Sequence, residues 1–197
     1  IITNDSFGVA LTIADNSYMG LISASVLEFE KPWEQTTTVL TAFPMGKYGL
    51  PETSSAGDTL YGICSKLGVS LSELKEMNPK VKDTMVLHVG ERRLSCRFAR
   101  FLGEDALELE LTLAQPPMDS MVIATPFDAP RAFYYNQKIN CMRASGVMTL
   151  GRRRFEFAPE TSFGTLDWGR GVWTYDNTWY WGNGNGIVNG KPFGFNI

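Results

Sequence analysis

Hydrophobic and polar residues alternate along much of the chain. In residues 92–98, Leu94, Cys96 and Phe98 fall on every second position, with polar residues between them. The same alternation runs through residues 106–113, where four leucines are opposed to glutamate and threonine. A period of two predicts antiparallel strands that bury one face and expose the other.

Turn residues separate these segments from others of the same kind. Glycine opens the predicted turns at Gly90-Glu91 and Gly151-Arg152, and Asn189-Gly190 fits the hairpin turn that needs two positive φ angles. Many short strands without regular alternation of strand and helix predict a closed or nearly closed, lipocalin-like antiparallel barrel. The further strands are predicted at residues 8–14, 21–29, 36–42, 120–125, 133–142, 153–157, 172–181 and 191–195.

One segment has a helical period instead. Apolar residues between positions 59 and 77 repeat at spacings of three and four, which predicts two short amphipathic helices. Asp58 fits the N-cap of the first helix, and Ser70 with Glu73 fits a capping box that opens the second. The chain therefore divides into barrel strands at residues 1–52, a helical segment at 53–91 with a closing strand, and further barrel strands at 92–197.

The helical segment resembles the LysM family. The motif is carried by Gly57-Asp58-Thr59-Leu60, Lys66-Leu67-Gly68-Val69-Ser70, Asn78-Pro79 and Val89-Gly90-Glu91. The resemblance implies a βααβ unit that binds glycans containing N-acetylglucosamine, such as peptidoglycan or chitin. It places the glycan groove at Gly57, Asp58, Thr59, Leu60, Asn78 and Pro79. The family's first strand has no counterpart in residues 50–56, so a helical hairpin that only caps the barrel is the alternative.

A run of aromatic residues near the C-terminal end is the most unusual stretch. If residues 172–181 form a strand, Trp173, Tyr175, Trp179 and Trp181 share one face. Such a face predicts the lining of a cavity for an apolar ligand. Ordinary core packing is the alternative.

Outside the helical segment, the chain resembles an uncharacterised bacterial family of lipocalin-like proteins. The supporting runs are residues 14–20, 115–120, 134–140 and the tryptophan stretch. This family is similar, more distantly, to carotenoid hydratases and tocopherol cyclases, which handle isoprenoids. No catalytic residue carries over. Acid chemistry on an alkene would fall to Asp167 or Asp176 beside the aromatic run, although Asp167 also lies close enough to Arg170 to pair with it.

Composition removes several classes of protein. The chain is 44% hydrophobic with a net charge of −3, which argues against disorder and against a strongly basic nucleic-acid-binding face. No stretch reaches the length of a membrane span. Three scattered cysteines and the single His88 form no metal-site spacing, so neither a metal nor a cofactor is expected.

These observations predict a non-catalytic binding protein. The predicted partners are an aminosugar glycan at the LysM-like segment and a small apolar ligand at the barrel. The alternatives are an isoprenoid hydratase or cyclase and a purely structural domain. Unpaired cysteines and the lack of a visible signal peptide favour the cytoplasm, and a functional LysM segment favours the cell envelope. Both ends have the character of strand interiors, which suggests a piece of a longer protein.

Overall fold

The computed structural model describes residues 1–50 and 91–197, and every regular element in these two ranges is a β-strand. The predicted helices between residues 59 and 77, their closing strand up to Gly90, the glycan-binding residues, Cys64 and His88 all lie outside the described residues, whereas Glu91 is the first residue of β5. The strands are β1 (Ile2–Thr3), β2 (Phe7–Asp15), β3 (Met19–Glu28), β4 (Trp33–Ala42), β5 (Glu91–Leu102), β6 (Asp105–Ala114), β7 (Met121–Pro126), β8 (Phe133–Leu150), β9 (Arg153–Phe157), β10 (Phe163–Val172), β11 (Asn183–Val188) and β12 (Lys191–Asn196).

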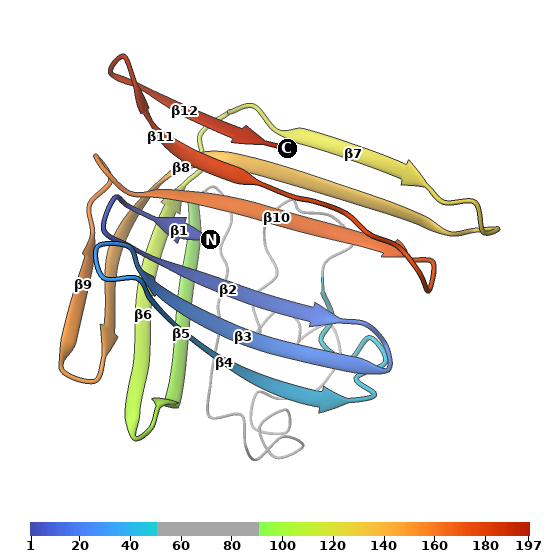
Figure 1. The fold of residues 1–197 in the computed structure, drawn as a ribbon, viewed down its shortest axis with the longest axis horizontal. Coiled ribbons are helices and arrows are strands. Elements are labelled where there is room, and N and C mark those ends of the chain that lie inside the picture. The colour runs from blue at the N-terminus through green and yellow to red at the C-terminus, as the bar shows by residue number, and fades with distance from the viewer. Residues whose placement is uncertain (51–90) are drawn as a thin grey trace.

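Ten of the strands form one antiparallel sheet that curls into a nearly closed barrel (Figure 1). The order across the sheet is β4-β3-β2-β1-β10-β8-β6-β5, and β7 and β9 pair with β8 outside this path. The two ends of the sheet meet where the Thr37 hydroxyl of β4 donates to the Phe101 carbonyl of β5 at 2.8 Å. The prediction of a mainly β, antiparallel and nearly closed barrel is confirmed.

The core lies where the alternating segments face inward. In β5, Leu94, Cys96 and Phe98 are buried as predicted, and the leucines of β6 are buried on the same inner side. They pack with β8, β9 and the strands of the N-terminal half. Phe7 of β2 lies edge-on to Phe155 and Phe157 of β9, with ring centres about 5 Å apart, which ties the two halves of the barrel together.

Strand β8 organises the rest of the fold because it is long enough to pair with four strands. Its first part pairs with β7 on one side and β10 on the other, and its second part pairs with β6 and β9. Strands β11 and β12 form a separate hairpin joined at Asn189-Gly190, both with positive φ, as the sequence predicts. This hairpin lies against β8 and β10 (Figure 1).

The sequence prediction is wrong for residues 163–188, although the strands at 153–157 and 191–195 are confirmed. The predicted strand at residues 172–181 is wrong, because β10 ends at Val172 and no strand follows until Asn183. Strand β10 itself was not predicted, since three glycines interrupt its pattern. The Gly-Asn-Gly-Asn-Gly run at residues 182–186 lies outside every predicted strand, yet it contains most of β11.

Candidate functional site

A β-bulge in the middle of β8 fixes the geometry of the site. Ile139 pairs with Leu166, and Met142 pairs with Gly164, so Asn140 and Cys141 together oppose the single residue Thr165. Cys141 has a φ of 62°, in the left-handed region that a side chain seldom adopts. The extra residue lets Ile139 and Met142 both face the core, and it turns Asn140 and Cys141 toward the outer surface.

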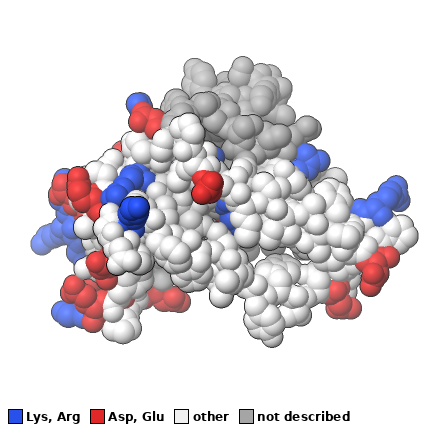
Figure 2. Space-filling view, turned by 90° about the horizontal axis from the view of Figure 1, so that it is seen from above, with Lys and Arg blue, Asp and Glu red and all other residues white. Residues whose placement is uncertain are grey.

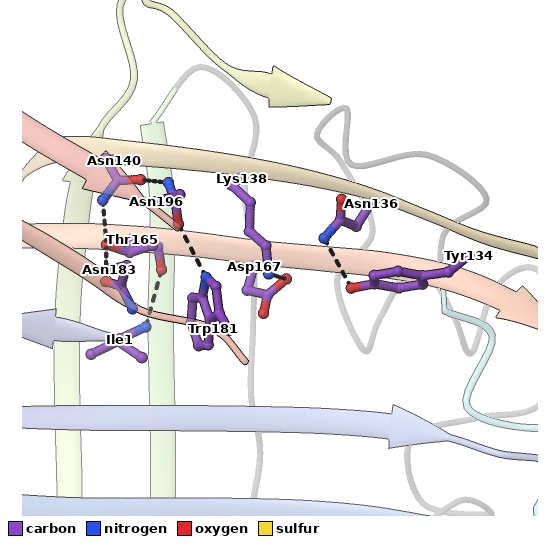
Figure 3. A network of polar contacts seen from close by, with 10 residues as sticks. All are labelled: Ile1, Tyr134, Asn136, Lys138, Asn140, Thr165, Asp167, Trp181, Asn183 and Asn196. Carbon is purple, nitrogen blue, oxygen red and sulfur yellow. Dashed lines mark hydrogen bonds and ion pairs between the residues drawn. The ribbon is translucent and has the colours of Figure 1, made fainter. Parts of the chain in front are cut away.

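Asparagine side chains hold the bulge in place. The Asn185 side-chain oxygen accepts the Cys141 backbone N–H at 2.7 Å and the Asn140 side-chain amide at 3.0 Å. The Asn185 amide in turn donates to the Thr165 hydroxyl at 2.8 Å, and that hydroxyl donates to Asn183 at 3.2 Å. Asn140 also accepts a short hydrogen bond from Asn196 (Figure 3). Asn140 and Asn185 are thus used as both donor and acceptor, which fixes the orientation of their amides.

These contacts explain the glycine and asparagine alternation of β11. In a strand, Asn183 and Asn185 share one face, and that face meets the bulge of β8. Glycine on the opposite face leaves room for the ring of Phe195, which a Cβ on Gly184 would meet at 2.6 Å. The period of two in this run is the signal that sequence reasoning missed.

A buried lysine lies next to the amide cluster. Lys138, only 5% exposed, places its Nζ 2.6 Å from a carboxylate oxygen of Asp167 on the paired position of β10. The same Nζ lies 4.2 Å from the ring centre of Trp181, whose indole N–H donates to the Asn196 side chain at 3.2 Å. The ammonium therefore has a carboxylate partner and an aromatic face (Figure 3).

The polar row continues along β8 from Lys138 toward its start. The Asn136 amide donates to the Tyr134 hydroxyl at 3.0 Å, while the side-chain oxygen of Asn136 is buried and has no hydrogen-bond partner in residues 1–50 and 91–197. Burial raises the pKa of the Tyr134 hydroxyl, with a smaller contribution from the negative charge of Asp167 and an opposing one from Asn136. Residues 134, 136, 138 and 140 thus form one polar face.

A groove of about 680 Å³ opens over this end of the polar face. Lys138, Asn140 and Cys141 form its floor. Residues 117–121 form one wall, and residues 192–196 of β12 form the other. Met118, Met121 and the two phenylalanines of β12 supply apolar surface. Burial raises the pKa of the Cys141 thiol at the floor, against a smaller lowering by Arg143.

The predicted aromatic cavity is not formed by one strand face. Trp173 lies against Tyr134 with ring centres 5.2 Å apart, and Trp181 stacks over Lys138. Tyr175 is fully exposed, and Trp179 is 68% exposed. Trp181 is the member of the predicted set that contacts the groove's lining, through Lys138 and Asn196.

The two candidate acids, Asp167 and Asp176, lie in different environments. Asp167 pairs with Lys138, and Asp176 lies in the exposed segment after β10. Within residues 1–50 and 91–197, no three His, Cys, Asp or Glu side chains gather as a metal site. The same residues contain no helix of the length and hydropathy that a membrane crossing requires.

Comparison with known families places the chain. A family model described as a domain of unknown function, DUF2804, matches residues 1–197. The chain belongs to this family. No curated protein and no solved structure was found to match it. Membership in a family of unknown function is as predicted, whereas these comparisons lend no support to the LysM resemblance or to a relation with carotenoid hydratases and tocopherol cyclases.

Proposed function

We propose that this DUF2804 chain is a non-catalytic binding protein whose ligand site is the groove between residues 117–121 and β12. The observation that carries the proposal is the groove itself, a concave surface of mixed apolar and polar lining above a rigid bulge. The amide cluster beneath it leaves the floor preorganised, because its side chains are locked by mutual hydrogen bonds.

The charge distribution favours a ligand with substantial uncharged surface. Figure 2 shows the face on which β7 and β12 lie, and its charged side chains gather toward the two ends while the middle carries few. The one lysine in the groove floor is neutralised by Asp167 at 2.6 Å. Beyond the groove, Ile123 lies on the same face of β7 as the groove residue Met121 and is 38% exposed. Contiguous apolar surface of this kind is typical of a binding site.

An isoprenoid hydratase or cyclase has less support. Protonation of an alkene requires an acid in a dry pocket with aromatic faces around it. Asp167 is engaged by the Lys138 ammonium, and Asp176 lies in an exposed segment. Neither carboxyl group is placed as such an acid.

Glycan binding by the LysM-like segment remains a proposal that rests on its sequence motif alone. Sedimentation of the full chain with insoluble peptidoglycan and with chitin tests it. Retention that is lost on Asp58→Ala with Asn78→Ala supports the proposal. A folded chain that stays in solution with both polymers contradicts it.

The groove is tested with N-phenyl-1-naphthylamine, an uncharged apolar probe whose fluorescence rises on burial. We expect saturable binding that Phe193→Ala weakens by about tenfold, since the phenyl group contributes roughly 1.5 kcal/mol of apolar burial. Phe193 is half-exposed, so its removal should leave the fold intact. Tyr175→Ala, which removes a fully exposed ring outside the groove, is the matched control. Loss of binding in Tyr175→Ala alone would assign the ligand to the aromatic segment.

A further inference from the structure

We propose that the ligand of the groove is an extended peptide that adds a strand to β12 at its edge opposite β11. This inference rests on the proposed function of the same groove and names its ligand class. Among the described residues, strand β12 pairs with β11 alone, and its other edge faces the groove across from residues 117–121. An open sheet edge in a groove is the usual setting for strand addition.

The hydrogen-bond register identifies the free groups. Gly182 and Ile197 exchange both backbone bonds at 2.9 Å, so alternate pairs further along the hairpin are bonded in the same way. Phe195 and Phe193 therefore bond to β11. Gly194 and Asn196 point their backbone N–H and C=O groups away from β11, and both residues line the groove.

These backbone groups argue against a purely apolar ligand. An acyl chain that fills the groove would cover the amides of Gly194 and Asn196 without bonding them, at a cost of about 1–3 kcal/mol for each unsatisfied group. A peptide strand satisfies them and still offers alternate side chains to the floor and to solvent. The close approach of Gly194 to the bulge, where a Cβ would lie 2.8 Å from the Cys141 sulfur, keeps β12 directly beside that floor.

Charge complementarity adds one specificity element. Of the described residues that line the groove, two are charged, Lys138 and Asp119. Lys138 is paired with Asp167, whereas Asp119 is exposed on the wall and makes no ion pair among the described residues. The preferred peptide accordingly carries a lysine or arginine that reaches Asp119, together with apolar residues at alternate positions.

The test is selection of random 12-residue peptides displayed on phage against the full chain. We expect selected peptides to share alternating apolar positions and a basic residue. Asp119→Asn should remove the preference for that basic residue, while Asp128→Asn, an exposed carboxylate between β7 and β8 that does not line the groove, should leave it unchanged. Methylation of alternate peptide amides should weaken binding by about tenfold, and methylation of the intervening amides should not.

Amide hydrogen exchange measured by NMR then locates the peptide. Exchange at Gly194 and Asn196 should slow by about tenfold or more on binding, while Phe193 and Phe195 stay as protected as in the free protein. Selection of no binders, or bound peptides that leave Gly194 and Asn196 unchanged, would overturn the inference. If the naphthylamine probe still binds in that case, the proposed function stands without the peptide. Protection of both amides in a free dimer would instead assign the edge to a second copy of the chain.

Discussion

The Lys138 ammonium lies 2.6 Å from the Asp167 carboxylate, on directly opposed residues of β8 and β10. The Lys138 side chain is buried, whereas the Asp167 side chain is about one-third exposed. The ion pair therefore lies at the boundary between the interior and the surface. Desolvation makes a buried ammonium costly unless a partner compensates it. The ion pair therefore stabilises the groove floor. It also engages the Asp167 carboxyl group, which the sequence suggested as a catalytic acid.

Removal of the carboxylate should destabilise the protein. We expect Asp167→Asn to lower the free energy of unfolding by about 1–3 kcal/mol, because it leaves the Lys138 ammonium buried without its charge partner. Urea unfolding measures this change. The matched control is Glu108→Gln, which breaks a surface pair with Arg97 and should cost less than about 1 kcal/mol. Equal costs for the two variants would contradict a structural role for the buried pair.

Gly146 in β8 should tolerate no side chain. Its φ is 130°, and a Cβ would lie 2.1 Å from the Glu110 carbonyl oxygen of β6. We expect Gly146→Ala to destabilise the fold by about 3 kcal/mol or more, through backbone strain and a forced separation of the two strands. A Cβ on Gly186 of β11 would meet no atom of the described residues within 4 Å, so Gly186→Ala should change the stability by less than about 1 kcal/mol. Thermal unfolding distinguishes the two variants.

The core assignment predicts a contrast between two leucines on strands of the same barrel. Leu109→Ala should cost about 2–5 kcal/mol, because Leu109 is buried among the core residues of β6. Leu40→Ala on β4 should stay within about 0.5 kcal/mol, since Leu40 is 64% exposed. Chemical denaturation provides both numbers. A large loss for Leu40 would mean that the outer face of β4 is covered in solution.

Cys141 should react slowly with iodoacetamide near neutral pH. Burial raises the pKa of its thiol, so less of the reactive thiolate is present at a given pH and the reaction rate should rise only at a higher pH than for a free cysteine. Arg143→Gln should move the pH profile further upward, because Arg143 lowers this pKa. The measurement uses Cys64→Ser with Cys96→Ser as background, so that one thiol is followed. A profile centred below that of a free cysteine would contradict the burial.

The sequence predicts the barrel well where strands are locally periodic. Leu94, Cys96 and Phe98 alternate with polar residues, and the burial of one face follows from that pattern alone. The hairpin at Asn189-Gly190 is equally local, because the turn residues themselves favour positive φ.

The site was less accessible to sequence reasoning because it depends on contacts between distant residues. Asn185 accepts a hydrogen bond from Cys141, which lies 44 positions away in the sequence, and nothing in the local pattern around either residue predicts this contact. Trp173 and Trp179 alternate as in a strand, yet the segment has no pairing partner in the described residues. Strand formation requires that partner, so an aromatic period of two was insufficient. The strand at residues 133–142 was predicted, but nothing in its local pattern indicates the bulge that turns Asn140 and Cys141 toward the groove.

The most direct test of the account is an NMR titration of the full chain with N-phenyl-1-naphthylamine. We predict that the backbone amide shifts concentrate in residues 138–141 and 192–196, around the groove. Shifts confined to residues 173–181, or to residues 51–90, would show that the ligand site lies elsewhere and would contradict the account.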